Sequence, residues 1–569
     1  MIKEQIGPIL QPHRRLIAYA GIAMVGATGV SLAGPLLTKI AIDHGIRRHD
    51  VGVIDLVAAI YLVLVLVRPV LERIIVLCSA RGGERFLGDL RVAAYDKLQE
   101  LSMPFFEETR AGVLVSRLTN DVQTLTTFTR TVLVEVVGSM LLFVVTLIVL
   151  IAMSPELSLV MLVSVPVLVW SSLRYGKRSR PAFMALRDRV ADTMSSLQEG
   201  LTGVRVVQSF GRQEDRYASY RARSSAQVSA WRRISLVNIG FFPMIAFAQS
   251  LALSAVLVAG GYLNRQGKVS VGTIIAFALY LISLFDPIAR LGDWFSEFQS
   301  GRAALAKIAG LLATPPTVIG GSAPLPEEGA LVVDDVTFAY GESAPAVVDV
   351  SLTIAAGEHL ALVGATGAGK STLAKLLVRA YDPQHGSLSF GGVDLRNASI
   401  DELRSRIVFV PQEGHLFSGS LADNVRLARP EATDGEVREA LRAIGALERF
   451  ADLLETDVRS RGVRLSGGER QLVSLARVAL VSPSVIVLDE ATSSLDPQTE
   501  AAVEQALASL AQGRTVITIA HRLSTAERAD RVAVMEHGKL VEIASHGELV
   551  RQGERYARLW ASWQAGVAV

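Results

Sequence analysis

A glycine-rich stretch, Gly364–Thr372, has the residue types and spacing of a phosphate-binding loop. It fits the pattern G-x-x-x-x-G-K-[ST], with Gly364, Gly369, Lys370 and Ser371 in register. The apolar run before it predicts a strand, and the residues after it predict a helix. Glycines let backbone N–H groups surround phosphate oxygens, and the helix N-terminus adds partial positive charge. We therefore expect Lys370 to neutralise β- and γ-phosphates and Ser371 to hold Mg²⁺.

Two adjacent carboxylates follow a second apolar run. Asp489 comes directly after Ser484–Leu488, and Glu490 comes next. A carboxylate at the carboxyl end of a buried strand can hold Mg²⁺ opposite a phosphate loop. Glu490 stands where it could polarise an attacking water. Together with the phosphate loop, this pair predicts nucleotide hydrolysis.

A third feature is the turn Leu465–Arg470, which precedes a helical pattern over Gln471–Val481. Its two glycines before a helix favour anion binding. The alternative is an ordinary helix start with Ser466 as the N-cap. A second phosphate-facing turn makes sense if it serves the nucleotide of another subunit.

This turn resembles the signature motif of ATP-binding cassette (ABC) ATPases, which is usually Leu-Ser-Gly-Gly-Gln. Other segments resemble further motifs of that family and occur in its order: the adenine-stacking aromatic (Tyr340), the Mg²⁺-sensing glutamine (Gln412), the dimer loop (Ser494 and Asp496) and the switch histidine (His521). Phe105–Glu107 and Leu114–Asp121 resemble the first cytoplasmic loop of the family's exporters. The resemblance therefore covers the whole chain.

The resemblance implies ATP as the nucleotide, Mg²⁺ as its metal and a dimer as the working unit. The catalytic residues are expected to be Glu490, His521 and Lys370. The ATP-binding residues would be Tyr340, Gly364, Ala365, Thr366, Gly367, Ala368, Gly369, Lys370, Ser371, Thr372 and Gln412, with Ser371, Gln412 and Asp489 holding the metal. The partner's ATP would meet Ser466, Gly467, Gly468 and Glu469.

Two residues depart from the family pattern. Glu469 replaces the usual glutamine of the signature, and Ser460 stands where related exporters often carry a glutamate. A homodimer would place a carboxylate near bound triphosphate in both sites, whereas a heterodimer would confine it to one. We therefore expect the working dimer to be a heterodimer rather than a homodimer.

The composition predicts a membrane part joined to a soluble part. Of the 569 residues, 50% are hydrophobic and 20% are charged, and the net charge of +2 gives no sign of nucleic acid as a partner. Cys78 is the only cysteine, so no disulfide can form within the chain. Long apolar runs predict six spans, arranged as hairpins in the lipid bilayer, at about 16–38, 54–80, 132–154, 157–174, 236–262 and 269–292.

Two connections between spans are long and rich in arginine, at about Arg81–Thr131 and Arg174–Arg233. Their apolar spacing predicts helices that extend the spans. The positive-inside rule places them and both termini in the cytoplasm. The expected architecture is an all-α transmembrane domain over 1–312, a linker over 313–329 rich in Pro and Gly, and an α/β phosphate-loop ATPase domain over 330–569. We expect a multi-pass protein of a bacterial inner (plasma) membrane.

A few polar residues in the membrane part invite functional interpretations. Arg68, Glu72, Asp286 and Arg290 either pair structurally, as Asp286 and Arg290 could at i,i+4 spacing, or line the transport path. The first turn holds Asp43, His44, His49 and Asp50, which suggest either a metal site or a polar loop; we favour the loop.

The sequence as a whole predicts an ATP-driven exporter half-transporter that moves an amphiphilic, lipid-like or drug-like molecule out of the cytoplasm by alternating access. One alternative is an importer on the exporter scaffold, for example for siderophores. The other is a nucleotide-gated channel or a regulatory subunit of a heterodimer, against which intact Glu490 and His521 count.

Overall fold

The computed structural model describes residues 2–412, 414–458, 465–489, 497–520 and 523–564. The chain forms two compact units. The first comprises Met1–Gln99 and Ala111–Thr314, and the second comprises Glu100–Arg110 and Pro315–Val569. The short segment Glu100–Arg110 therefore belongs to the second unit although it interrupts the first in the chain.

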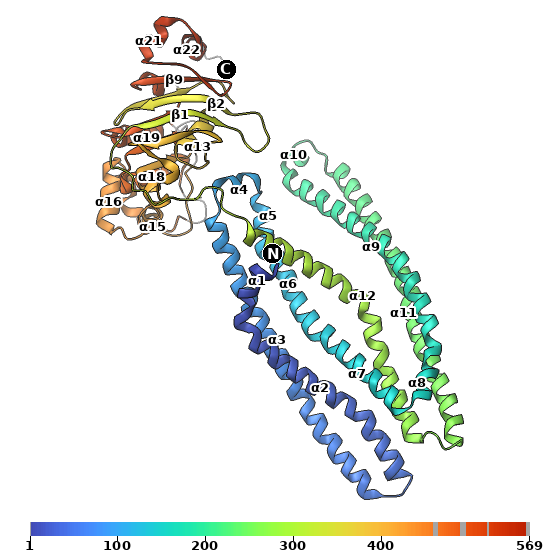
Figure 1. The fold of residues 1–569 in the computed structure, drawn as a ribbon. Helices are drawn as coiled ribbons and strands as arrows, with labels where there is room; N and C mark the ends of the chain where they lie inside the picture. The colour runs from blue at the N-terminus through green and yellow to red at the C-terminus, as the bar shows by residue number, and fades with distance from the viewer. Residues whose placement is uncertain (1, 413, 459–464, 490–496, 521–522, 565–569) are drawn as a thin grey trace. The chain divides into compact units, whose positions relative to one another are not determined.

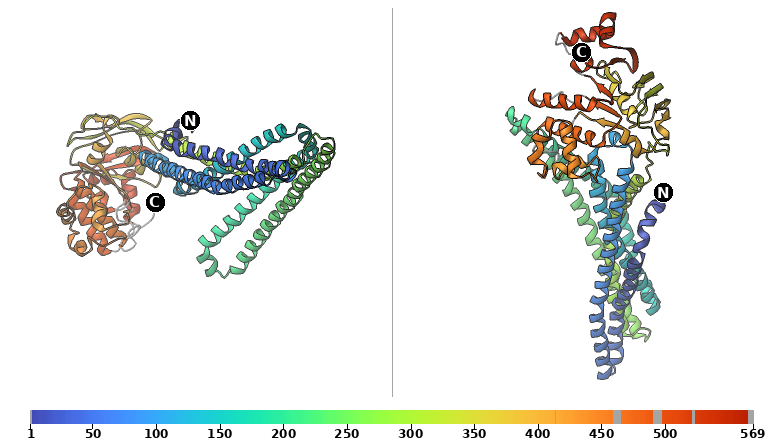
Figure 2. Two further views of the ribbon diagram at one scale, coloured as in Figure 1. Left: turned by 90° about the horizontal axis from the view of Figure 1, so that it is seen from below. Right: turned by 90° about the vertical axis from the view of Figure 1, so that its left-hand side faces the viewer.

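The first unit is built from helices (Figure 1). Their bounds are α1 Ile2–Leu10, α2 Arg14–Ile40, α3 Val51–Glu100, α5 Ala111–Ser116, α6 Val122–Arg130, α7 Val137–Met153, α8 Pro155–Met161, α9 Val165–Thr202, α10 Val204–Ser209, α11 Gln213–Arg265 and α12 Val271–Ala313. Helices α9 and α11 pack along each other, and α12 packs against α2, α7 and α11 (Figures 1 and 2). Short π-helical stretches join α5 to α6 and α6 to α7.

Five helical stretches in the described part of the chain are long and apolar enough to cross a membrane: Glu4–Ile46, Val51–Glu100, Ala111–Met153, Pro155–Thr202 and Gln213–Arg265. A shorter apolar stretch, Val271–Phe285, opens α12. These six stretches correspond in order to the six predicted spans. A helix satisfies its backbone N–H and C=O groups internally, which a chain in hydrocarbon requires.

Side-chain caps define where two of these helices begin. Ser154 follows α7 and accepts a hydrogen bond from the Leu157 N–H at 3.3 Å, so α8 starts at Pro155. Ser270 accepts from the Thr273 N–H at 3.1 Å and starts α12. Asp43 supports the same end of α12, since its Oδ1 accepts from the Gly272 N–H at 2.9 Å and its Oδ2 accepts from the Ser270 hydroxyl. The short hairpin turns thus arise from N-capping chemistry.

The second unit contains a six-stranded sheet in the order β10-β9-β3-β8-β7-β6. The strands are β3 His359–Val363, β6 Ile407–Val410, β7 Val485–Asp489, β8 Thr515–Ile519, β9 Arg531–Glu536 and β10 Lys539–Ala544. All neighbours are parallel except β10 with β9. Every residue of β8 is buried, as expected for a parallel strand covered on both faces.

A four-stranded antiparallel sheet lies over the first, in the order β2-β1-β4-β5 (Figure 1). Its strands are β1 Leu331–Phe338, β2 Val347–Ile354, β4 His385–Phe390 and β5 Val393–Asp394. Apolar side chains of both sheets and of α13 (Lys370–Leu377) form one buried core.

Helices complete the second unit. Their bounds are α4 Met103–Glu108, α14 Ile400–Arg406, α15 Leu421–Arg426, α16 Asp434–Ala443, α17 Leu447–Phe450, α18 Gly467–Val481, α19 Pro497–Ala511, α20 Leu523–Glu527, α21 His546–Gln552 and α22 Arg555–Gln564. A second core unites α15–α19 with one face of the sheet. This arrangement of a mostly parallel sheet with flanking helices matches the α/β architecture expected for this part of the chain.

Candidate nucleotide site

The glycine-rich loop connects β3 to α13, in the strand–loop–helix order that the sequence predicted. Its backbone requires glycine at two positions. Gly364 has φ +149° and Gly369 has φ +100°, and a Cβ at either would lie within 2.4 Å of a carbonyl oxygen, that of Met535 or of Ala346. Glycine at these two positions therefore lets the loop pass close to neighbouring backbone.

Lys370, the first residue of α13, places a nearly buried ammonium against this loop. The residue is 4% exposed, and its Nζ donates to the carbonyl oxygens of Gly364 at 2.8 Å and Ala365 at 3.0 Å. A buried cation next to a loop of backbone donors at a helix N-terminus is suited to bind phosphate groups.

Sheet topology brings further predicted residues to the same edge. Asp489 is the last residue of β7, and Gln412 follows β6 by two residues. The strands β3, β8, β7 and β6 are consecutive and parallel, so their carboxyl ends share one edge with the phosphate loop. Carboxylate, amide and hydroxyl oxygens are ligands that Mg²⁺ accepts, and Ser371, Gln412 and Asp489 supply these types. The donor set thus fits the expected metal.

Several predicted residues lie outside the described part of the chain. These are Glu490, Ser494, Asp496, His521 and Ser460. In the chain, Glu490 directly follows Asp489, and His521 comes two residues after β8 ends at Ile519. Their predicted roles remain predictions.

Tyr340 follows β1 and belongs to a cluster of aromatic rings. Its ring meets that of Phe338 edge-on with centroids 5.0 Å apart, and that of Tyr381 with centroids 5.3 Å apart. Its hydroxyl donates to Thr372 Oγ1 at 3.2 Å, which ties it to the first turn of α13, at the end of the phosphate loop. An aromatic face near the loop is suited to stack on a nucleotide base.

The turn before α18 is a complete capping box. The Ser466 Oγ accepts from the Glu469 N–H at 3.2 Å, and Glu469 Oε2 accepts from the Ser466 N–H at 2.8 Å. The N-cap that was the alternative interpretation is therefore present. It places the Glu469 carboxylate at the N-terminus of α18, beside Gly467 and Gly468, where anions are stabilised.

Family models match both parts of the chain. Residues 17–288 match the "ABC transporter transmembrane region", and residues 347–493 match "ABC transporter". An "ATP-dependent lipid A-core flippase" of Thiobacillus denitrificans is 34% identical over 92% of this chain and 91% of its own length. The chain belongs to the ABC transporter family. It is an ATP-hydrolysing transporter and a multi-pass integral membrane protein of the bacterial inner (plasma) membrane type, as the sequence predicted.

Two further comparisons bear on the architecture. A "Multidrug efflux ATP-binding/permease protein" of Mycobacterium bovis is 35% identical over 97% of this chain, which spans only 47% of that relative's length. The structure of a bacterial Atm1-family ABC exporter with ATP bound superposes with a TM-score of 0.80, at 26% identity, covering 96% of this chain and 98% of that one. The exporter fold with fused membrane and ATPase parts is therefore confirmed.

The charged residues in the spans of this ABC transporter include two ion pairs. Arg68 Nε donates to Glu72 Oε1 at 2.8 Å on α3, as the structural interpretation expected. Arg290 lies 3.8 Å from Glu135. The side chain of Asp286 is outside the described ones, so the predicted Asp286–Arg290 pair remains a prediction.

In the polar first turn, two aspartate side chains cap neighbouring helices. Asp50 Oδ1 accepts from the Gly52 N–H at 3.0 Å and caps α3, while Asp43 caps α12 as described above. Among the residues that the structure describes, no group of three or more His, Cys, Asp or Glu side chains could hold a metal ion.

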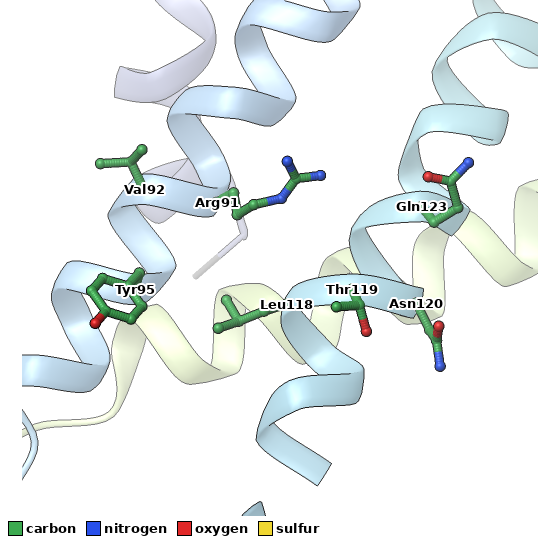
Figure 3. A pocket seen from close by; sticks show the side chains of 7 residues that line it. All are labelled: Arg91, Val92, Tyr95, Leu118, Thr119, Asn120 and Gln123. Carbon is green, nitrogen blue, oxygen red and sulfur yellow. The ribbon is translucent and has the colours of Figure 1, made fainter. Parts of the chain in front are cut away.

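A cavity of about 780 Å³ lies in the first unit between α3 and the π-helical stretch before α6. It is lined by Arg91, Val92, Tyr95, Leu118, Thr119, Asn120 and Gln123. Arg91 and Leu118 point from their two helices into the space between them (Figure 3). None of these residues is among the predicted catalytic or nucleotide-binding ones.

Sequence reasoning missed two side chains that contact Tyr340, namely Tyr381 and Lys375, and a third, Glu107, that contacts both of them. Lys375 Nζ lies 5.9 Å from the centre of the Tyr340 ring, and both Lys375 and Tyr381 donate to Glu107. No local pattern could have revealed them, because Glu107 and Tyr381 are separated by 274 residues.

Proposed function

We propose that this chain is one half of an ATP-driven exporter that moves an amphiphilic, lipid-like or drug-like molecule out of the cytoplasm by alternating access. The observation that carries the proposal is the shared edge of β3 and β7 in the second unit. There the phosphate loop with Lys370 and the carboxylate of Asp489, the expected metal ligand, come to the same edge, in a chain whose first unit contains long apolar helices.

In this proposal Lys370 and the loop N–H groups neutralise the triphosphate, and Tyr340 stacks on the adenine. Mg²⁺, held by Ser371, Gln412 and Asp489, would supply charge neutralisation on the phosphate oxygens. Glu490 polarises the attacking water, and His521 acts near the γ-phosphate. Because Lys370 is already held against its loop by two carbonyl oxygens, its charge is positioned before the nucleotide arrives.

Two observations support this substrate class: the pairing of charged side chains within the spans, and the names of similar proteins. The pairing of Arg68 with Glu72 and of Arg290 with Glu135 neutralises two charges of each sign in the spans, which favours an amphiphile over a strongly charged substrate. The names of the multidrug efflux relative and of the lipid A-core flippase point to the same class.

We further propose that two such halves form the working dimer, and that the partner is a different half-transporter. The multidrug efflux relative, about twice as long as this chain, is consistent with two halves in one assembly. In the capping box, the negative Glu469 offsets the partial positive charge of the α18 N-terminus, so this turn would hold a partner's triphosphate less strongly. A heterodimer confines that weaker site to one of two.

The test is ATPase activity and transport in lipid. The chain is reconstituted alone, and together with candidate half-transporters, in nanodiscs and in inside-out vesicles. We expect hydrolysis to rise with particular amphiphiles, and ATP to drive those molecules into inside-out vesicles. Uptake in the opposite direction would contradict the exporter assignment. A stable, substrate-stimulated dimer of this chain alone would contradict the heterodimer.

A further inference from the structure

The carboxylate of Glu107, on the short helix α4, is held by two side chains of α13 and the loop after it. Lys375 Nζ donates to Glu107 Oε1 at 2.7 Å, and the Tyr381 hydroxyl donates to Glu107 Oε2 at 2.7 Å. Both carboxylate oxygens are thus used. All three residues belong to the second unit, although α4 lies between two predicted spans in the chain.

The two donors to Glu107 also contact the ring of Tyr340. The Tyr381 ring packs against Tyr340 at an interplanar angle of 88°, and the Lys375 ammonium lies 5.9 Å from the Tyr340 ring centre. An edge-to-face contact and a cation near a ring face each restrict how a ring can rotate. Glu107 therefore fixes the two groups that fix Tyr340.

The cluster is partly shielded from water. The side chains of Lys375 and Glu107 are 29% and 33% exposed, and Tyr381 is 8% exposed. Although burial alone would raise the pKa of Glu107, its hydrogen bonds to Lys375 and Tyr381 hold that pKa below the usual range. Burial and the adjacent Glu107 raise the pKa of the Tyr381 hydroxyl, so it stays a donor at neutral pH.

We infer that Glu107 is a positioning residue for adenine recognition, because it orients Tyr340 through Tyr381 and Lys375. This inference rests on the proposed stacking of Tyr340 on adenine. Glu107 itself touches neither phosphate nor base. Its contribution should therefore appear only for ligands that carry a base, and only while Tyr340 is present.

The experiment compares two ligands, Mg·ATP and magnesium tripolyphosphate, which lacks base and ribose. Their affinities are measured by calorimetric titration of the full chain in nanodiscs. Glu107→Ala should raise the Kd for ATP about three- to tenfold, which is less than the direct loss of a charge-assisted hydrogen bond to ligand, because Glu107 acts only through Tyr381 and Lys375. The Kd for tripolyphosphate should not change. Tyr381→Phe, which keeps the ring and removes one donor, should give a smaller change in the same direction.

Three further variants separate the explanations. Glu108→Ala, the neighbouring carboxylate on the same helix, should leave both affinities unchanged. Glu107→Ala added to Tyr340→Ala should cause no further loss of ATP affinity, since the effect acts through Tyr340. Melting temperatures of all variants report whether each still folds.

The inference is overturned if Glu107→Ala and Tyr381→Phe both leave ATP affinity unchanged, or if Glu107→Ala weakens ATP and tripolyphosphate equally. An additive loss in the double variant would overturn it as well. If instead Tyr340→Ala alone leaves ATP affinity unchanged, the stacking role of Tyr340 in the proposed function is what fails.

Discussion

Ser466 and Glu469 bind each other across the first turn of α18. Each accepts a hydrogen bond from the backbone N–H of the other, at 3.2 Å for the Ser466 Oγ and 2.8 Å for Glu469 Oε2. These hydrogen bonds give Glu469 a local structural role as the N3 residue of the capping box. A glutamine, the family's usual residue here, can fill the same position. What distinguishes the two is charge at a turn that is expected to meet a partner's triphosphate.

Glu469→Gln should therefore keep the helix start and remove the charge. We expect tighter ATP binding at the site that this turn serves, by about two- to fivefold, the range for one charge at a helix N-terminus. The measurement is ATP affinity and ATPase activity of the assembled dimer in nanodiscs.

A matched control for this variant exists elsewhere in the second unit. Ser545 and Glu548 form the same capping box at α21, where no nucleotide contact is expected. Glu548→Gln should leave ATP affinity unchanged. Equal ATP affinity for Glu469→Gln and the unmodified chain would mean that the Glu469 carboxylate does not act on the triphosphate.

Lys370→Ala should weaken ATP binding itself. The variant removes the buried ammonium of the phosphate loop, and charge-assisted hydrogen bonds of this kind correspond to about a 10- to 100-fold change in Kd. Direct titration with Mg·ATP measures the effect, and exposed Lys539→Ala is the control for loss of one positive charge. Unchanged affinity in Lys370→Ala would remove this loop from the nucleotide site.

His359, at the start of β3, should make the stability of the second unit depend on pH. Burial lowers the pKa of its imidazole from the ordinary value of 6.5, against the opposing effect of Asp530. The unfolded chain therefore takes up this proton at a higher pH than the folded chain does. The contribution to the free energy of unfolding is complete above about pH 6.5 and is lost as the pH falls below it.

His359→Gln should accordingly flatten the fall in unfolding temperature between pH 7 and pH 5, as followed by thermal unfolding of the full chain. The exposed His385→Gln is the control and should retain the slope of the unmodified chain. A slope that is the same in all three proteins would exclude His359 as its source.

Much of this architecture could be predicted because its signals are local. Charge-free runs predicted the spans at about 16–38 and 236–262, which lie within the helices Arg14–Ile40 and Gln213–Arg265. The prediction was possible because a chain in hydrocarbon must satisfy its backbone hydrogen bonds internally. The phosphate loop could be predicted because its glycines and Lys370 occupy fixed spacings between a strand and a helix. Asp489 was placed correctly at the end of its strand by the apolar run before it.

Contacts between distant segments could not be predicted. Glu107 lies in a segment that resembles a cytoplasmic loop of exporters, but nothing in its surroundings shows that Lys375 and Tyr381 would bind it. The capping role of Glu469 was missed for a different reason. Comparison with the family's usual glutamine concerns only the charge of Glu469, whereas the S-x-x-E pattern of Ser466–Glu469 predicts the capping box.

The most direct test of the account is to measure phosphate release and ATP affinity together for Glu490→Gln, in the full-length dimer in nanodiscs. ATP binding is proposed to rest on Tyr340 and the phosphate loop, whereas Glu490 is proposed to polarise the attacking water. The account predicts that ATP affinity stays within about twofold while phosphate release falls to background, and that the exposed Glu554→Gln changes neither. Phosphate release from Glu490→Gln at the rate of the unmodified protein would contradict it.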